Sequence, residues 1–473
     1  MGFLDDLKIR ARQWLGIDEF MDEALQQRYD RNATLRNYYR GVQRKQLRVR
    51  TGQADDNLTL NYVGLVIERG ISMLLGEGIE FDLGGEEEED ARQEYIDEIW
   101  LANKRDILLH KIAQYGGNIG TCYMKILPDG TSARDDSEKL LPRLIPLDPL
   151  LMEIVTPAED IDQVLMYVMR YNIINERGEE VARKEETVQN FVAVEEQGES
   201  GPQIVGFQNN GWTINNYEAG RNGNWVLMSS ELWAYEFPPI IHWQNLPLAG
   251  SPYGMSDVEN VIDLQDRINF IASNISKIIR YHAHPKTWGR NIGTQSEQSW
   301  GADEMVVFNG DNAMLDNLEM QSDLLESQNF LLSLRQSLFD ITRTVDITSL
   351  ADKLGALTNF GLRVLFYDSI AKLNTKKELY GEALVELNHR LLELGEINPS
   401  DGGEVVWPDT LPGNEQEEVA GLQFDLNAGI VSKQTAARDR GYDWEIEQER
   451  IGEEKVSNEN FGSLLLQQFE QGQ

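Results

Sequence analysis

Cysteine is almost absent from this 473-residue chain, since Cys122 is the single one. One cysteine cannot form a disulfide within the chain, and it cannot supply the paired thiolates of a cysteine-based zinc site. Long hydrophobic runs are missing too, because no apolar stretch approaches the ~20 residues that cross a bilayer. The first residues, Met1 to Asp6, lack the basic and long apolar regions of a secretory signal. We therefore expect a soluble protein that assembles inside a cell.

Sequence motifs of common enzymes are also missing. There is no Gly-x-x-x-x-Gly-Lys-[Ser/Thr] phosphate loop and no His-Glu-x-x-His zinc motif. Of the five histidines, only His282 and His284 lie close together, and a spacing of two residues points them apart at a helix end. We therefore expect no catalytic residue, no metal and no cofactor. A carboxylate-metal nuclease stays open as an alternative, because 79 acidic residues leave room for a metal cluster that sequence does not single out.

Positive charge is scarce. The 43 basic and 79 acidic residues give a formal net charge of −36, and such a surface repels phosphate instead of attracting it. Ordinary DNA binding is therefore excluded, whereas a conduit for DNA would gain from walls that do not hold the polymer. Solubility alone also explains an acidic chain, and an acidic DNA mimic remains a second alternative. The acidic run from Glu86 to Asp90 is interpreted as solvated charge.

The first half of the chain predicts a mixed α+β arrangement. Residues 1–50 are typical of charged helix, with a basic cluster between Arg40 and Arg50. Apolar residues at helical spacing predict a helix over 61–75, which Gly76 stops before a short strand. A helix from Asp106 should lead into a hairpin with its turn at 128–130. Alternating residues over 163–243 predict an antiparallel sheet, with turns at 209–211 and 222–224.

Two striped helices dominate the second half. Ser256, with Asp257 and Glu259 behind it, has the chemistry of a helix start. Apolar residues then follow in steps of three and four: Val261, Leu264, Ile268, Ile271, Ile275 and Ile278. A second helix from Ser322 repeats the pattern with Leu331, Leu334, Leu338, Ile341 and Val345. Either the two helices form a hairpin with an insertion at its far end, or they form a plain helical hairpin packed against the chain's own core.

The segments between and after these two helices also have patterns that predict structure. Residues 284–321 contain Trp288, Trp300 and strand-like runs, and predict a small β-rich insertion at the far end of the hairpin. A segment of small residues, 346–360, follows the second helix. Residues 361–395 predict one helix on the order of 50 Å long, before a strand at 404–407 and further helices. At this length the chain should form several subdomains that share contacts.

In this order the sequence resembles the portal proteins of tailed phages, specifically the SPP1-like siphophage type, from about residue 61 to 454. The resemblance is carried by four stretches: Asn61 to Ile79, Asn245 to Asp257, Leu264 to Asn269, and Asn427 to Thr435 followed by Glu445 to Lys455. It implies an α+β portal fold. The implied parts are an N-terminal arm and wing (1–255), stem helices (256–283 and 322–345), a clip (284–321), a tunnel loop (346–360), a long wing helix and wing strand (361–413) and a crown (414–473).

The resemblance also implies sites and partners. A ring, usually of twelve copies, would stand at one capsid vertex of the virion after assembly in the host cytoplasm. Double-stranded viral DNA would pass through it, and it would meet the terminase large subunit, the head-tail adaptor, and the major capsid and scaffolding proteins, but no membrane. Tunnel-loop contacts with DNA fall on Lys353, Thr348, Ser349 and Asn359, and clip docking falls on Trp288 and Trp300. The subunit seam falls on Leu264, Ile268, Ile271, Ile275, Leu334, Leu338 and Ile341.

Overall fold

The structure, a computed structural model, describes residues 23–452 except 50, 52–54, 77, 85–90, 133–139, 158, 175–177, 199–200, 221–223, 234, 284–285, 291–311, 313, 319–323, 349–358, 398–401, 409–414, 439, 441–443, 445 and 449. The chain divides into two compact units, Met1–Pro408 and Asp409–Gln473.

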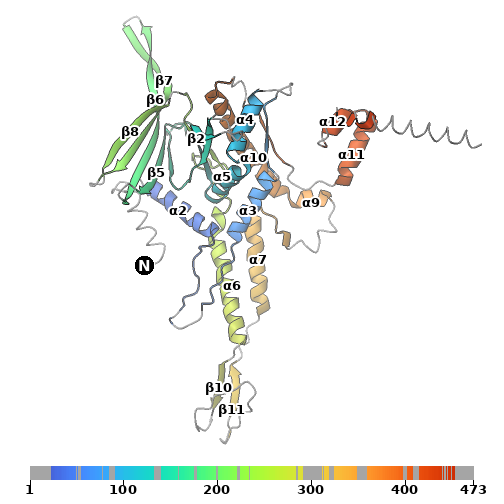
Figure 1. Cartoon of the computed structure of the whole chain (residues 1–473). Coiled ribbons are helices and arrows are strands. Elements are labelled where there is room, and N and C mark those ends of the chain that lie inside the picture. The colour runs from blue at the N-terminus through green and yellow to red at the C-terminus, as the bar shows by residue number, and fades with distance from the viewer. Residues whose placement is uncertain are drawn as a thin grey trace, which may run out of the picture. The chain divides into compact units, whose positions relative to one another are not determined.

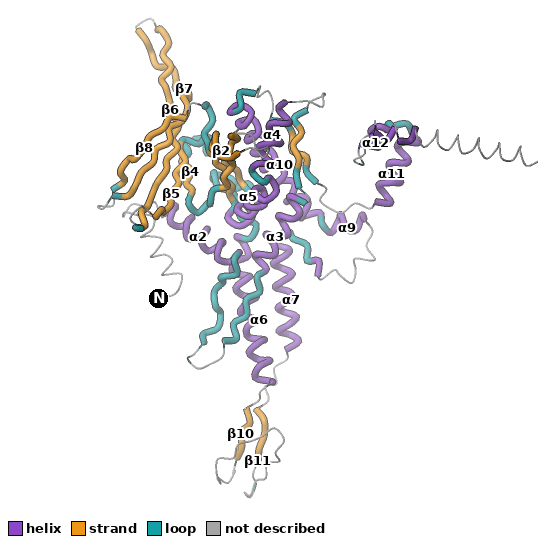
Figure 2. Tube along the Cα trace, viewed as in Figure 1, coloured by secondary structure: helices purple, strands orange, loops and turns teal. Residues whose placement is uncertain are grey.

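Helices and antiparallel sheets both build the first unit, so the predicted α+β class is confirmed (Figures 1 and 2). Its helices are α2 (Glu23–Tyr39), α3 (Tyr62–Leu75), α4 (Ala91–Ala102), α5 (Arg105–Ile119), η1 (Glu259–Val261), α6 (Ile262–Ala283), α7 (Leu324–Ile341), α9 (Asn359–Leu365) and α10 (Tyr367–Leu394). The helix predicted over 61–75 is α3. It begins where the Asn61 side chain accepts a hydrogen bond from Gly64 N, and it ends at Gly76, whose φ of 51° suits glycine.

Two larger sheets and two strand pairs complete this unit. One sheet has the order β3 (Leu140–Pro146), β2 (Thr121–Ser132), β9 (Ile240–Gln244). The other has five strands in sequence order: β4 (Met152–Val155), β5 (Met166–Ile174), β6 (Glu180–Gly198), β7 (Gly201–Ala219) and β8 (Trp225–Trp233). The pairs are β1 (Glu80–Asp82) with β12 (Glu404–Val406), and β10 (Lys286–Arg290) with β11 (Met314–Leu318).

The antiparallel sheet predicted over 163–243 is present, but two predicted turns are wrong. Residues 128–130 lie inside β2, at a register shift between Leu127 and Thr131. Residues 209–211 lie inside β7, beside another register shift, and Gly211 has a φ of +80° there. Glycine provides the positive φ of a bulge as readily as that of a hairpin turn, so the local sequence does not distinguish the two. Of the third predicted turn, residues 222 and 223 lie outside the described residues; beside them Gly220 N donates to Asn224 O between β7 and β8.

Three predicted helix boundaries also differ. Residues 40–49 form a turn followed by a loop and are not helical, so the described part of the basic cluster lies outside a helix. The long helix predicted over 361–395 is divided between α9 and α10 at Phe366. The second striped helix ends at Ile341 instead of Val345, because Arg343 turns into the left-handed region with a φ of 52°.

Two hydrophobic cores hold the first unit together. The main core packs α3, α4, α5 and α10 against one another and against β2, β3 and β9. At its centre the Trp100 indole donates a 2.9 Å hydrogen bond to Asn388 of α10. A second core joins the two larger sheets, with Tyr123 and Ile240 on one side and Tyr167 and Trp212 on the other. The two sheets and α10 are therefore fixed to one another.

The second unit contains α11 (Glu415–Ala428) and α12 (Lys433–Arg438). Between them Gly429 has a φ of +69°, and Ser432 Oγ accepts a 3.1 Å hydrogen bond from Thr435 N at the start of α12. These helices confirm the prediction of a helical end. In the described part of the chain, no helix has the length and apolar character required to span a bilayer.

Candidate functional site

The two striped helices form a hairpin in which α6 and α7 lie side by side (Figure 1). The β10–β11 pair is inserted between them in the chain, with Lys286 opposite Leu318 and Arg290 opposite Met314. Ridges of residues in steps of three and four are the surfaces by which neighbouring helices interlock. The predicted hairpin with a β insertion is therefore present. Trp288 lies on β10 opposite Asp316, and Trp300 lies outside the described residues.

The apolar stripes are covered largely within the single chain. Ile268 and Leu338 are 0 % exposed, and Ile271 and Ile275 are also buried. The partly buried Leu264 and Leu334 pack against the same core. Ile341 differs, because its side chain is 52 % exposed. Because four members of the predicted seam are already buried within the single chain, they offer little surface to a neighbouring subunit. The subunit seam stays a prediction, with Ile341 as its exposed member.

A second side of α6 is covered by the described residues of 42–60 (all but 50 and 52–54), which we call the strap (Figure 2). Three buried polar residues at i, i+4 and i+8 bind its backbone. Gln265 donates to Leu60 O at 2.5 Å, Asn269 Oδ1 accepts from Leu60 N at 2.9 Å, and Ser273 Oγ accepts from Leu58 N at 2.9 Å. The strap forms no helix or sheet that would pair these backbone groups, so side chains of α6 provide their hydrogen-bond partners instead.

One ion pair and one hydrogen bond between side chains also join the strap to α6. Arg280 Nη2 of α6 lies 2.6 Å from Asp56 Oδ2, and Asn269 Nδ2 donates to Gln43 Oε1 at 2.5 Å. Within the strap, Asn57 bonds both backbone groups of Leu47, at 2.8 and 3.0 Å. The strap is therefore a loop folded on itself and fixed along α6.

Asp257, at the base of the hairpin, is a buried anion between two cations. Its carboxylate oxygens lie 2.6 Å from Lys376 Nζ and 3.0 Å from Lys372 Nζ, both on α10. Burial alone raises the pKa of Asp257, but the two lysines outweigh it and the pKa falls to about 2. Burial lowers the pKa of Lys376, and the Asp257 charge opposes that shift. The carboxylate is thus ionised and joins the hairpin base to α10.

The predicted helix start at Ser256 is wrong in its detail. Its Oγ donates to Asn118 O at 2.6 Å and accepts from Val258 N at 3.3 Å, while α6 proper begins at Ile262. Polar residues in this tight turn bind the end of α5 instead of capping α6, a distinction that sequence alone does not make. The burial of Lys376 and its pairing with Asp257 were not predicted, although the sequence contains a signal for the burial. Lys376 is three or four residues from Leu373 and Tyr380, and it shares the buried face of α10 with them.

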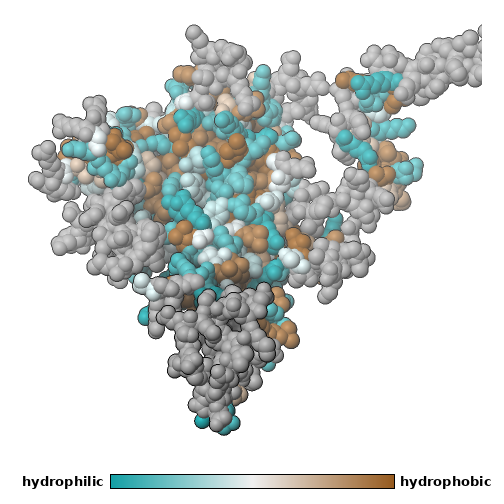
Figure 3. Space-filling view, turned by 60° about the horizontal axis from the view of Figure 1, so that its bottom comes forward, coloured by the Kyte–Doolittle hydropathy of each residue, from teal (hydrophilic) through white to brown (hydrophobic). Residues whose placement is uncertain are grey.

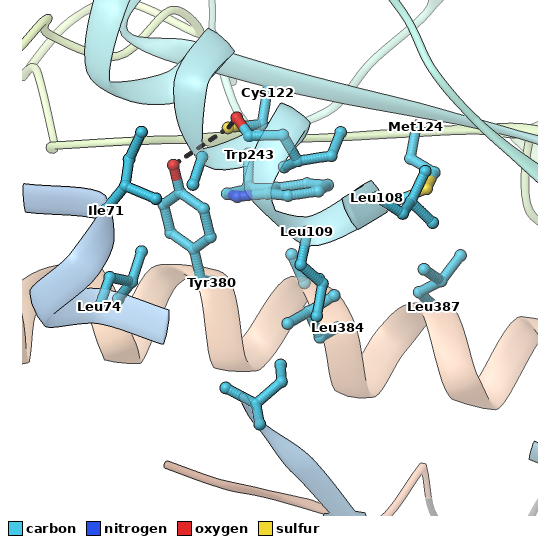
Figure 4. Packing of buried hydrophobic residues seen from close by; sticks show 14 of the residues in the cluster. Ile71, Leu74, Leu108, Leu109, Cys122, Met124, Trp243, Tyr380, Leu384 and Leu387 are labelled. Atoms are coloured by element: carbon cyan, nitrogen blue, oxygen red, sulfur yellow. Dashed lines mark hydrogen bonds between the residues drawn. The ribbon is translucent and has the colours of Figure 1, made fainter. Parts of the chain in front are cut away.

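Tyr380 and Cys122 lie among closely packed hydrophobic residues of the main core (Figure 4). Tyr380 Oη donates to Asn245 Oδ1 at 3.1 Å and accepts from Cys122 Sγ at 3.3 Å. A Cβ atom on Gly116 would lie 2.0 Å from Tyr380 Oη, so a side chain at this position has no room. Burial raises the pKa of the Cys122 thiol to about 12, which makes this cysteine unreactive. The cluster is therefore a fixed structural joint.

The segment after α7 is held from two sides. Arg69 of α3 donates to Val345 O at 3.0 Å, and Lys372 of α10 donates to Thr342 O at 3.0 Å. Arg335 pairs with Asp346 at 2.7 Å. Of the predicted DNA-contacting residues, Thr348 is exposed, Asn359 begins α9, and Ser349 and Lys353 lie outside the described residues. The predicted loop therefore starts from an anchored position.

No group of three or more His, Cys, Asp or Glu that could hold a metal occurs among the described residues. The acidic run 86–90 lies outside them.

Comparison with known proteins gives one result. The family model for phage portal proteins of the SPP1 Gp6-like type matches residues 18–459, nearly the whole chain. No match was found among the curated proteins. Since the match covers both striped helices, the insertion between them and the helices after them, the chain belongs to the SPP1 Gp6-like family of phage portal proteins, structural components of the capsid's portal vertex and not enzymes.

Proposed function

We propose that this chain forms the ring at one capsid vertex through which viral DNA is packaged and ejected. The observation that carries the proposal is the α6–α7 hairpin with a β insertion at its far end, in a chain that the portal family matches from residue 18 to 459. Copies arranged around an axis would line a channel with their hairpins. Twelve copies would carry 12 × (−36) = −432 formal charges, so that DNA phosphates are repelled and the duplex stays mobile.

Each part of the chain has a role in this proposal. Residues 1–255 form the arm and wing, 256–283 and 322–345 the stem, 284–321 the clip, 346–360 the tunnel loop, 361–413 the long wing helix and wing strand, and 414–473 the crown. The wing assignment is supported by the core that fixes α10 to both larger sheets. The stem assignment is supported by the joint at Asp257, which connects the hairpin base to α10.

The tunnel loop is the proposed place of DNA contact. Both ends of residues 349–358 are attached to described structure, at Val345 and at α9. Lys353, with Thr348, Ser349 and Asn359, would touch phosphates there, and a lysine among small residues gives one weak contact at each subunit. A ring of such contacts would follow the duplex without holding it.

The clip is the proposed docking surface for the terminase large subunit during packaging and later for the head-tail adaptor. Trp288 lies on β10 of the insertion, and large aromatic residues are common anchors of protein interfaces. Trp288 and Trp300 are the residues that we expect these partners to cover. The capsid and scaffolding proteins would contact the wing and the arm.

Images of purified particles test the proposal. We expect rings with a central hole built from this one chain. A chain that stays a compact monomer at every concentration would contradict the ring, and a divalent-dependent nuclease activity lost on one Asp or Glu substitution would favour an enzyme instead. Cross-linking of packaged DNA to a photoreactive group at residue 353 would then test the tunnel-loop contact.

A further inference from the structure

The strap, α6 and α7 form a row with α6 in the middle. On a helix that turns about 100° per residue, the side chains that bind the strap (265, 269, 273) and those of the apolar stripe (264, 268, 271, 275) are separated by roughly a third of a turn. The strap therefore covers a different side of α6 from the side that faces α7, as Figure 2 also shows. The outer members of the row are the strap at one edge and α7 at the other.

Exposed apolar side chains gather on the two outer members. On α7 they are Leu325, Phe330, Leu332 and Ile341, each 49–61 % exposed, and on the strap they are Val42, Val49 and Leu58, each 43–48 % exposed. Among the described side chains of α6, Ile279 is the one large apolar residue that is exposed. Figure 3 shows hydrophobic residues lying between polar ones on the face of the molecule that it presents. Apolar groups repeated along both edges are typical of surfaces that another protein covers.

The charges of the two edges are opposite. The described charged residues of the strap are Arg44, Lys45, Arg48, Asp55 and Asp56. Arg44 lies 3.8 Å from Asp266, Lys45 pairs with Asp55 at 2.5 Å, and Asp56 pairs with Arg280 at 2.6 Å. Arg48 is exposed and gives the strap edge its positive charge. Helix α7 has two exposed charged residues, Glu326 and Asp340, and both are negative. Its one basic residue, Arg335, is paired with Asp346. The strap edge of one copy is thus complementary to the α7 edge of another.

We infer that the strap of one subunit docks against α7 of the next subunit, and that this contact is the seam of the stem. The inference rests on the proposed function, in which the chain forms a ring. Two different edges that fit each other produce a head-to-tail contact, which closes into a ring when the rotation allows it, whereas a twofold dimer would pair identical edges. The occupant of the exposed α7 edge is therefore a second copy of this chain, bound through its strap.

Cross-linking between single-cysteine variants tests the seam. Val49→Cys and Leu325→Cys are made separately in the full chain, mixed, assembled and treated with a short bis-maleimide. Since the two cysteines lie on different copies, any product between them joins two subunits, and the native Cys122 is buried and does not interfere. We expect a dimer product about tenfold above that of a control mixture of Val49→Cys with Leu101→Cys, because neighbouring thiols have a high effective concentration. Leu101 is similarly exposed, but on α4.

Charge exchange provides a second measurement. Arg48→Glu and Glu326→Lys alone should each reduce the fraction of rings seen by native mass spectrometry, and the two together should restore it. Glu94→Lys, a reversal at an exposed position of α4, should leave that fraction unchanged. Rings that form normally with no product between positions 49 and 325 and no response to either reversal would overturn the seam while leaving the ring intact. A chain that forms no rings would overturn both.

Discussion

At the scale of single residues, the buried carboxylate of Asp257 is the charge on which the joint between the hairpin base and α10 depends. Its carboxylate pairs with Lys372 and Lys376, and the exposed fractions of the three side chains are only 2 %, 12 % and 5 %, so that water screens these charges little. Removal of one partner from a buried ion pair leaves an uncompensated charge, which costs about 3–5 kcal/mol. We therefore predict that Asp257→Asn lowers the free energy of unfolding by about that amount, measured by urea denaturation.

A matched control lies two residues further along the chain. Glu259 pairs with Arg31 at 2.7 Å, but both side chains are partly exposed, at 28 % and 33 %. Water weakens such a pair, so Glu259→Gln should cost about 1 kcal/mol or less. Equal losses for the two variants would show that Asp257 is not the joint described above.

The free energy of unfolding should depend on pH through His242, which lies beside the second core. Burial, and after it the positive charge of Arg390, lower the pKa of the imidazole to about 4. Tyr167 Oη lies 2.9 Å from its Nδ1 atom, and the Tyr123 ring stacks against it. An unfolded chain takes up this proton near pH 6.5, whereas the folded chain resists it until about pH 4. The free energy of unfolding should therefore fall as pH drops through this window, by at most about 3 kcal/mol.

Thermal unfolding at pH 7, 5.5 and 4.5 measures this effect. The wild-type chain should lose more stability on acidification than His242→Gln, in which no proton is taken up at this position. His110→Gln, at an exposed histidine, should behave like the wild type. If His242→Gln keeps the full pH dependence, the loss belongs to carboxylates elsewhere.

At the scale of elements, the strap depends on side chains of α6. Asn269 accepts from Leu60 N and donates to Gln43, and no other bonded partner of Leu60 N is described. We predict that Asn269→Ala makes the amides of Leu58 and Leu60 exchange hydrogen at least about tenfold faster, equivalent to about 1.4 kcal/mol of local opening energy. Hydrogen exchange followed by mass spectrometry gives this rate.

The control for this change is Lys277→Ala, at an exposed position of the same helix. It removes a long side chain with no described contact to the strap and changes the helix propensity little, because lysine and alanine are both good helix formers. Faster exchange in both variants would mean that α6 itself frays, and unchanged exchange in Asn269→Ala would mean that the remaining contacts suffice to hold the strap.

Sequence predicted the elements whose signal is local and periodic. The stripe of α6 and α7 and the stop at Gly76 depend on neighbours within one or two turns, and these elements are confirmed. The strap was missed because Gln265, Asn269 and Ser273 have the composition of a solvated helix face, whereas their partners lie more than 200 residues away in sequence. Asp257 was interpreted as a helix-start charge for the same reason: its lysines are 115 and 119 residues further along the chain.

At the scale of the whole molecule, net charge opposes assembly. Subunits of −36 each repel one another over a distance that shrinks from about 30 Å in 0.01 M salt to about 8 Å in 0.15 M salt. We predict that the fraction of rings rises with salt over this range, as followed by sedimentation velocity. The local attraction between strap and α7 is weakened as well, but it involves few charges.

Sodium chloride and tetramethylammonium chloride at equal ionic strength distinguish screening from specific ion binding. Equal responses to the two salts support screening. Rings that fall apart as salt rises would show that attraction between opposite charges, and not repulsion, decides assembly.

The strap also sets an order of events during synthesis of the chain. Its residues leave the ribosome about 200 residues before the side chains of α6 that bind them, a delay of roughly 10–40 s at 5–20 residues per second. Throughout that interval Leu58 and Leu60 have no helix to lie on. In the ring that we propose, a chain without α6 would lack the support that holds the strap half of the inferred seam.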